Sequence, residues 1–346
     1  MSYTKLDTTD FVVSADSVVA PAWTSGLPTL TSFFTSSIRQ SPAGQFYLDV
    51  YDTALTGSTA QIQFSIAYGN VNGYGSQLYN PLVAGMSPSR TTYGQYRTLV
   101  YADETVRFNF GNGNSSADDI IVINVDRNRY KESLFPGTLK LALTSGSNTI
   151  NLTDNSVDIT NSSLPITYLD CGRVFNIVSG SYGTAASNAL TGLTPSGSYG
   201  LFLPDIGTII LNPAALKLPY ASGGLGVTFD TSTNPSLPTS SVNNTIAYNL
   251  IKNGTCFQLN SQETVSSNYV FVRVKNGEYN YTNNPTFLSG STGQLIYPTL
   301  INSPQTYPTT VGLYNDNNEL LAVAKMSKPM MKDFSHEALL RIKIDW

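Results

Sequence analysis

A serine–histidine–acid triad is the first chemistry to consider, because the chain contains a single histidine. His336 lies in the segment Phe334–Glu337, directly before the last stretch of alternating apolar residues. In a triad it would have to be the base, since no other histidine is present. No Gly-x-Ser-x-Gly motif, which would place a nucleophilic serine on a tight turn, accompanies it. We therefore expect His336 to be a surface or turn residue.

Clusters of asparagine and aspartate offer the oxygen ligands that calcium prefers. Asn315–Glu319 is one such cluster, but it lies between two apolar stretches, where the same residue types form turns. Asp118 and Asp119 precede an apolar run in the same way. The sequence favours a turn and a loop end at these two places, and we predict no metal site.

Two cysteines, Cys171 and Cys256, are too few for a disulfide framework in a chain of 346 residues. A zinc site would need both of them together with His336 and carboxylates. Structural and catalytic zinc sites normally contain ligands paired at short spacing, which is missing here. The prediction is two buried free thiols.

Phosphate-binding and nucleic-acid-binding patterns are also missing. No Gly-x-x-x-x-Gly-Lys-Ser/Thr motif occurs, and Gly73-Tyr74-Gly75 is too isolated to bind a dinucleotide. The basic run Asp126–Lys131 is short, and Glu132 follows it. It indicates a solvated segment at the end of a strand, with an ion pair between subunits as the alternative. We expect no cofactor and no nucleic-acid partner.

Glycoside hydrolysis needs only two carboxylates, so composition does not exclude a polysaccharide depolymerase. The chain has 21 tyrosines, which could stack against sugars. Tyrosine is equally an ordinary residue of sheet faces and protein interfaces. The residues thus favour no particular reaction, and we predict that the protein is not an enzyme and has no catalytic residues.

The composition indicates what kind of fold would position these residues. Charged residues make up 12% of the chain, and 19 basic against 23 acidic residues give a net charge of −4. An ordinary globular domain has about 25% charged residues. Disorder requires low hydrophobicity and high net charge, and a nucleic-acid surface requires a basic excess, so both are excluded. A folded, β-rich protein with an uncharged polar surface remains.

Alternating apolar residues predict the main strands. These are Gln61–Tyr68, with one polar side, the buried run Ile120–Val125, and a hairpin over 139–152. A second hairpin joins Thr310–Tyr314 to Leu320–Ala324, and the last strand is Leu340–Trp346. Helical spacing predicts two short helices, over Ser89–Tyr101 and from Asn243 or Asn244 through Ile251. The predicted fold is therefore mainly β, with antiparallel, sandwich-like sheets, two short helices and long polar loops.

Three regions are predicted along the chain. Residues 1–45, with Pro21, Pro28 and Pro42, form an extended N-terminal assembly arm, 46–160 a β subdomain, and 161–346 a second β subdomain. Residues 218–242 are rich in proline and glycine and predict a long surface loop. The N-terminus shows no secretory signal and no segment is apolar enough for a transmembrane helix, so we expect no membrane insertion.

Several spaced motifs resemble a family of virion structural proteins from contractile-tailed phages of cyanobacteria. They are Phe46–Asp52, Gln63–Gly69, Tyr130–Gly137, Tyr199–Gly207 and Thr310–Trp346. The C-terminal hairpin also looks like an element of phage tail-fibre and baseplate-associated proteins. The resemblance covers most of the chain and carries over no catalytic residues.

The resemblance implies a viral structural protein without enzymatic activity, in the virion tail or baseplate, linking the tail to peripheral fibres. Its partners would be other virion subunits and further copies of itself, in a symmetric homo-oligomer assembled in the host cytoplasm. Two alternatives stay open: a receptor-binding tail-fibre module that recognises host surface polysaccharide, and a head decoration protein. The low content of charged residues agrees with a role in assembly, because the centres of protein interfaces are depleted of charged residues.

Overall fold

The computed structural model describes residues 3–35, 47–73, 89–111, 113–186, 193–231, 239–281 and 284–345. The chain forms two compact units. Unit 1 comprises Met1–Ser17 and Thr264–Trp346, and unit 2 comprises Val18–Glu263. This division differs from the predicted one, because the expected boundary at residue 160 falls inside unit 2. The expected arm is also divided, with its first 17 residues in unit 1.

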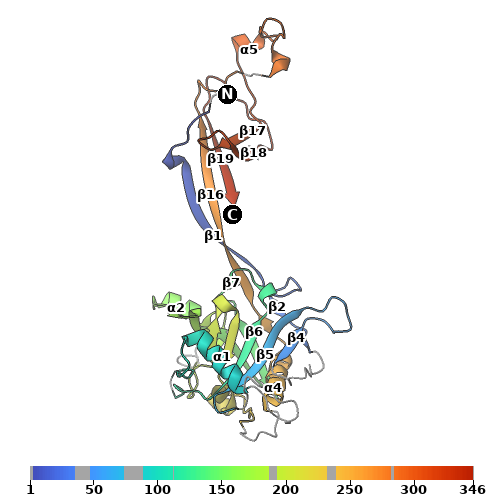
Figure 1. Ribbon diagram of the computed structural model, residues 1–346, viewed down its shortest axis with the longest axis vertical. Coiled ribbons are helices and arrows are strands. Elements are labelled where there is room, and N and C mark those ends of the chain that lie inside the picture. The colour runs from blue at the N-terminus through green and yellow to red at the C-terminus, as the bar shows by residue number, and fades with distance from the viewer. Residues whose placement is uncertain are drawn as a thin grey trace. The chain divides into compact units, whose positions relative to one another are not determined.

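Unit 2 is built on one large antiparallel sheet of 13 strands (Figure 1). The order along the sheet is β2-β15-β8-β9-β11-β13-β14-β6-β5-β4-β3, and β10 and β12 also pair with β11. The mainly β, antiparallel fold predicted from the sequence is confirmed. The strands are β2 (Thr29–Leu30), β3 (Phe34–Thr35), β4 (Leu48–Tyr51), β5 (Ile62–Asn70), β6 (Asp119–Val125), β8 (Lys140–Ser145), β9 (Asn148–Asp154), β10 (Thr167–Leu169), β11 (Gly172–Ser181), β12 (Thr184–Ala185), β13 (Gly200–Leu203), β14 (Thr208–Leu211) and β15 (Phe257–Gln258).

Both faces of this sheet are covered, as the unbroken apolar run in β6 predicts. Ile121 and Ile123 belong to one buried cluster, and Ile120 and Val122 belong to the other. The first cluster includes residues of α4 (Thr239–Gly254), and the second includes residues of α1 (Ser89–Tyr101). Alternate side chains of each central strand therefore enter different cores.

The sheet curls around the larger core. Phe64 on β5 and Phe257 on β15 are far apart in the strand order, yet their ring centroids lie 5.2 Å apart. Trp23 packs on Phe257 at 4.9 Å and donates a hydrogen bond from Nε1 to the Phe257 carbonyl. The predicted polar side of β5 is not uniformly exposed, because Gln63 is fully buried. Its amide binds Thr24, which explains how a polar side chain is tolerated there.

The described residues contain five α-helices, where the sequence predicted two. Helix α1 has the predicted bounds, whereas α4 begins at Thr239, before the asparagines expected to cap it. The three additional helices are single short turns, which leave no helical periodicity in the sequence. They are α2 (Ser156–Asn161), α3 (Pro213–Lys217) and α5 (Thr299–Asn302). No helix among the described residues has the length and apolar character needed to cross a membrane.

The segment 218–242 is not a long surface loop in its described part. Leu225, Val227 and Phe229 are buried and belong to the larger core of unit 2. Backbone hydrogen bonds from Leu225 and Gly226 to the carbonyls of Leu216 and Leu218 fix the segment against α3. Prolines and glycines interrupt the apolar pattern of this segment. For this reason the alternation of Leu225, Val227 and Phe229 did not lead to the prediction of a buried segment. Residues 232–238 lie outside the described residues.

Unit 1 contains most of a second sheet, with strand order β1-β16-β19, and a separate two-stranded hairpin (Figure 1). Its strands are β1 (Phe11–Pro21), β16 (Asn260–Val274), β17 (Thr310–Tyr314), β18 (Leu320–Lys325) and β19 (Ala338–Asp345). β16 pairs with β19 from Ser267↔Asp345 to Val274↔Ala338, and its first residues pair with β7 (Ser133–Leu134). The predicted C-terminal hairpin and last strand are confirmed, although Trp346 lies outside the described residues.

Candidate functional site

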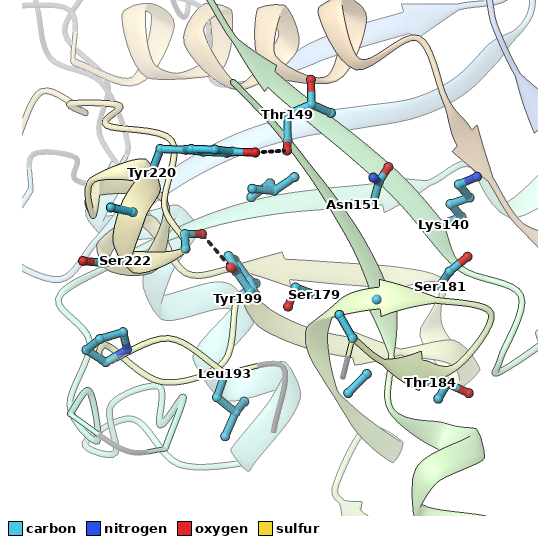
Figure 2. Close-up of a pocket in the computed structure, with 17 residues that line it drawn as sticks. Lys140, Thr149, Asn151, Ser179, Ser181, Thr184, Leu193, Tyr199, Tyr220 and Ser222 are labelled. Carbon is cyan, nitrogen blue, oxygen red and sulfur yellow. Dashed lines mark hydrogen bonds between the residues drawn. The ribbon is translucent and has the colours of Figure 1, made fainter. Parts of the chain in front are cut away.

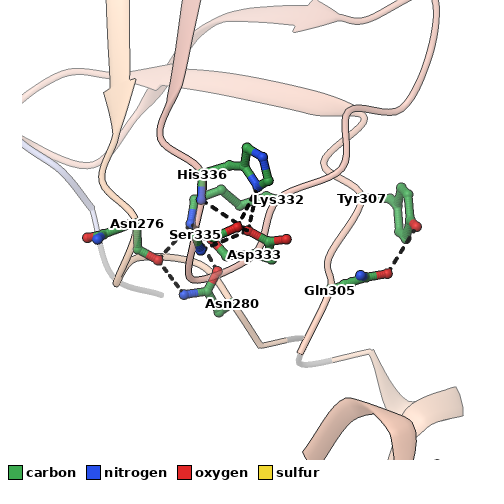
Figure 3. Close-up of polar contacts among 8 residues, drawn as sticks. All are labelled: Asn276, Asn280, Gln305, Tyr307, Lys332, Asp333, Ser335 and His336. Carbon is green, nitrogen blue, oxygen red and sulfur yellow. Dashed lines mark hydrogen bonds and ion pairs between the residues drawn. The ribbon is translucent and has the colours of Figure 1, made fainter. Parts of the chain in front are cut away.

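His336 belongs to a small polar cluster that lacks the geometry of a catalytic triad (Figure 3). Its Nδ1 lies 2.8 Å from Asp333 Oδ1 and also 2.8 Å from Ser335 Oγ. In a triad the acid and the serine contact opposite ring nitrogens, so that the proton can pass through the ring. Asp333 Oδ1 also accepts hydrogen bonds from the backbone amides of Ser335 and His336. The cluster is thus an aspartate-capped turn, and the prediction of a turn histidine is confirmed.

Lys332, next to this turn, is the largest side chain of unit 1 without exposed surface among the described residues. Its Nζ donates to the carbonyl oxygens of Asn276 and Asp333, each at 2.8 Å, and to Asn280 Oδ1 at 2.9 Å (Figure 3). The three acceptors use all three donors of the ammonium group. Lys332 therefore holds two loops of unit 1 together and has no donor left for a ligand.

The two oxygen-rich segments have local structural roles. Asn315 Oδ1 accepts from the amides of Asn317 and Glu319, which closes the loop between β17 and β18. Asp118 pairs with Arg107, and Asp119 accepts a hydrogen bond of 3.4 Å from Tyr68. Groups of three or more potential metal ligands do not occur among the described residues.

The cysteines and the basic run have local explanations. Cys171 and Cys256 are both free thiols. Cys171 is buried as predicted, while Cys256 is half-buried. Burial raises the pKa of the Cys171 thiol, which makes it a poor nucleophile. In the basic run, Arg129 donates to Thr24 Oγ1 at 3.0 Å and to Gln61 Oε1 at 2.9 Å within its own chain.

An open cavity of about 1220 Å³ lies in unit 2 (Figure 2). Its described lining consists mainly of small polar and apolar residues, with two tyrosines and one lysine. Tyr199 donates a hydrogen bond of 2.6 Å to the Gly223 carbonyl, so its hydroxyl is already used. Tyr220 is exposed, and its hydroxyl lies 3.4 Å from the Thr149 carbonyl. No acidic residue is found among the described residues that line the cavity.

The sheet of unit 1 has two faces of different chemistry. The register pairs Val270 with Ile342 and Val272 with Leu340, and these side chains share one face because side chains alternate along a strand. Tyr269 lies opposite Lys343 on the other face. We call the first the apolar face and the second the charged face. On β16 and β19 the apolar face carries Val270, Val272, Val274, Ala338, Leu340, Ile342 and Ile344.

Strand β1 is the outer neighbour of β16 in this sheet. The pKa of Lys343 on β19 is raised, mainly by its hydrogen bond to Asp345. β1 itself carries the apolar residues Phe11, Val12 and Val13, all of them exposed. Sequence reasoning missed these residues because the N-terminal region was taken as an arm, although Phe11–Val13 and Val18–Val19 are typical of a strand.

Ion pairs on the charged face are closed within the chain. Asp10 lies 3.5 Å from Arg273 Nε, and Lys343 Nζ lies 3.0 Å from Asp345. Asp345 also accepts a hydrogen bond from Ser267. A face with internally paired, exposed charges is compatible with water.

The apolar face on β16 and β19 carries buried or half-buried side chains, whereas β1 is exposed along nearly its whole length. Val13 is 73% exposed and Phe11 is 50% exposed. Among the described residues of unit 1, the buried hydrophobic side chains are Val270, at 2% exposure, and Ala338, at 9%. Contiguous exposed apolar surface on a folded protein usually marks a site of association. The exposed apolar start of β1, Phe11–Val13, is therefore the candidate functional site.

No protein-family model, curated protein or solved structure matches the chain.

Proposed function

We propose that the protein is a non-enzymatic structural subunit of a phage virion. Its place would be in the tail or baseplate, where it links the tail to peripheral fibres. The observation that carries the structural role is the exposed apolar start of β1, Phe11–Val13. The virion assignment rests on the sequence motifs that resemble tailed-phage structural proteins.

Association explains why such a surface is retained. Burying apolar surface stabilises a complex by about 25 cal/mol per Å², and stable interfaces bury about 800 Å² on each partner. The exposed start of β1 offers Phe11, Val12 and Val13 without a charged residue among them. Removing it from water would incur no cost of burying unpaired charges.

Exposed tyrosines support the same role. Among the tyrosines that the structure describes, ten are exposed, and six of these ten lie in unit 1. Tyrosine is enriched at protein interfaces because it combines an apolar ring with a hydroxyl that can find a partner. Partners of the protein would accordingly be other virion subunits and further copies of the chain.

Labelling of virions tests this proposal. Antibodies against the purified protein would be applied to virions of the phage that encodes it, and the gold label located by electron microscopy. We expect the label at the tail, close to its fibre-bearing end. Label on the capsid would contradict the tail assignment and support head decoration. Virions without label, from a lysate in which the protein is abundant, would overturn the structural role.

A receptor-binding role is the second candidate, favoured by the cavity in unit 2. Tyr220 exposes its ring at this cavity, and hydroxyl and amide groups of Thr149, Asn151 and Ser181 surround it (Figure 2). Rings and neutral hydrogen-bonding groups are suited to an uncharged polysaccharide. Trp23 does not contribute, since it is buried in the core.

Glycan binding distinguishes this candidate from the structural role alone. In titration calorimetry with polysaccharide from the host envelope, the receptor-binding role predicts binding that Tyr220→Ala abolishes. Tyr168→Ala is the matched control, because Tyr168 is similarly exposed and does not line the cavity. Absence of binding by the unaltered protein would exclude this candidate. Release of reducing ends would instead reveal a depolymerase, whose carboxylate pair the described lining of the cavity does not supply.

A further inference from the structure

We infer that the cavity of unit 2 binds an acidic polysaccharide, with Lys140 holding an anionic group and the ring of Tyr182 supporting the sugar that carries it. The inference rests on the receptor-binding candidate for the place of the ligand. It adds the chemical class of the ligand and two residues that recognise it. The neutral groups around Tyr220 suit uncharged units of the same polysaccharide.

Lys140 is the single charged residue in the described lining of the cavity. It is the first residue of β8, which pairs with β9 and β15 inside the large sheet. Its side chain is half-buried, and its ammonium group has no hydrogen bond or ion pair with any residue that the structure describes. An anionic ligand gains more from a partly desolvated cation than from one surrounded by water. Lys140 is therefore a suitable anchor for an acidic group.

The surroundings of Lys140 are neutral. The described lining contains no acidic residue, and residues 187–192, between two lining residues in the sequence, include neither an acid nor a base. Asp158 on α2 does not belong to the lining, and its carboxylate accepts a hydrogen bond of 2.7 Å from the Ala185 amide. The chain as a whole has a net charge of −4 and repels polyanions. Binding of a polyanion thus requires a local site such as this one.

Tyr182 presents an aromatic ring next to Lys140. The Lys140 Nζ lies 5.9 Å from the centroid of this ring, and 58% of the tyrosine is exposed. Its neighbours Ser181 and Thr184 both line the cavity, and Figure 2 shows Lys140 beside Ser181. The apolar face of a sugar can pack on the ring while an acidic substituent of the same sugar binds the ammonium group.

A tight turn fixes the position of Tyr182. Tyr182 and Gly183 join β11 to β12, and both have positive φ, of 52° and 75°, as type I′ turns require. The Gly183 amide donates to Thr153 Oγ1 at 2.8 Å, and its carbonyl accepts from the Val157 amide at 3.1 Å. Asparagine or glycine is preferred at the first position of such a turn. The turn itself therefore does not account for a tyrosine there.

A row of polar groups connects Lys140 to Tyr220. Asn151 on β9 pairs with Ala142, two residues from Lys140 on β8, so both side chains lie on the same face of the sheet. Thr149 follows on that face, and its carbonyl accepts the hydroxyl of Tyr220 at 3.4 Å. The cavity of about 1220 Å³ exceeds the roughly 300–1,000 Å³ typical of small-molecule sites. A chain of several sugar units therefore fits this row better than a single small ligand.

Titration calorimetry of the full-length protein with three defined polymers is the first test. Polygalacturonate carries carboxylates, dextran sulfate carries sulfate esters, and dextran is neutral. We expect binding of at least one acidic polymer, which weakens as the salt concentration rises, and weaker binding of dextran. The two acidic polymers show which anionic group the site prefers. Absence of binding to both, or equally strong binding of dextran, would overturn the inference.

Lys140→Met keeps the length of the side chain and removes its charge. We expect the Kd for the acidic polymer to rise about tenfold, because a charge-assisted contact is lost. Lys252→Met is the matched control, since Lys252 is exposed, lies 5.7 Å from the ring of Tyr248 and does not line the cavity. It should leave the Kd unchanged. Unchanged binding by Lys140→Met, or equal losses in the two variants, would contradict the inference.

Tyr182→Asn removes the ring and supplies a residue that the turn prefers. We expect the Kd to rise about fivefold, while the melting temperature stays constant or rises. Unchanged binding by this variant would refute the role of Tyr182. Binding of acidic polymers by a protein that does not bind host polysaccharide would contradict only the receptor-binding candidate. Binding of host polysaccharide that Lys140→Met leaves unaltered would contradict only this inference.

Discussion

β6 in unit 2 and β1 in unit 1 are both rich in branched apolar residues, yet their environments are opposite. Ile120, Ile121, Val122 and Ile123 of β6 have no exposed surface. All residues of β1 are exposed except Ser14, which is half-buried. Neighbouring strands and helices on both faces account for the burial of β6, whereas β1 is an edge strand of a single sheet.

The difference extends to the whole of each unit. Both hydrophobic clusters consist of residues from unit 2. Unit 1 is held instead by backbone pairing and by polar contacts such as those of Lys332. The low content of charged residues thus has one structural origin in the two hydrophobic clusters of unit 2.

The largest expected effect is the loss of an aromatic ring from the core of unit 2. Phe64→Ala removes a fully buried side chain that contacts Trp23, Phe33 and Phe257. We expect the free energy of unfolding to fall by about 4 kcal/mol, because a cavity remains in a closely packed core. Urea denaturation followed by tryptophan fluorescence measures this loss, since Trp23 is in the same core.

Phe11→Ala is the matched change in unit 1 and removes the same atoms from the exposed strand β1. We expect the urea midpoint of unit 2 to remain unchanged in this variant. Equal losses of stability in the two variants would contradict the contrast between a buried and an exposed apolar strand.

Removal of the buried lysine should destabilise unit 1 alone. Lys332→Met leaves the carbonyl oxygens of Asn276, Asn280 and Asp333 without their donor. Each unsatisfied buried acceptor costs about 1 kcal/mol or more, so we expect a loss of about 3 kcal/mol in local stability. Hydrogen exchange read by mass spectrometry should show faster exchange around residues 276–281 and 330–336, with no change in the core of unit 2.

Lys328→Met provides the control for this variant, because Lys328 is an exposed lysine close in the chain. It should leave exchange unchanged throughout. If Lys332→Met also lowered the urea midpoint of unit 2, the two units would not be independent in the way their separate interiors indicate.

Elements with strong local signals were predicted well from the sequence. The bounds of α1, the hairpin of β8 and β9 and the hairpin of β17 and β18 follow from periodicity and from turn residues. The unbroken apolar run of β6 correctly indicated burial on both faces. These features depend on residues adjacent in the chain, so no knowledge of distant partners was needed.

Features that depend on distant partners were missed. Trp23 was placed in an arm, but β15 supplies Phe257, 234 residues away, as its packing and hydrogen-bonding partner. Gln63 was expected to be exposed, but Thr24 satisfies its amide in the interior. The shared apolar face of β16 and β19 was also missed, because the two strands are distant in the chain and their common face depends on strand register.

The smallest predicted effect concerns the charge at the start of β6. Burial raises the pKa of Asp119 to about 6, and the neighbouring charge of Asp118 adds to this effect. The native state therefore keeps a proton that the unfolded chain releases near pH 4. The free energy of unfolding should fall by about 2 kcal/mol as the pH rises from about 4 to 7. Urea denaturation at a series of pH values measures this slope.

Asp119→Asn removes the titrating group and should flatten this part of the pH dependence. Asp118→Asn is the control, since Asp118 pairs with Arg107 at the surface, and it should keep most of the slope. In unit 1 the charges of Lys343 and Asp345 are exposed, so no comparable dependence on pH is expected there. A slope that persists in Asp119→Asn would show that two-sided burial of β6 does not control the ionisation of Asp119.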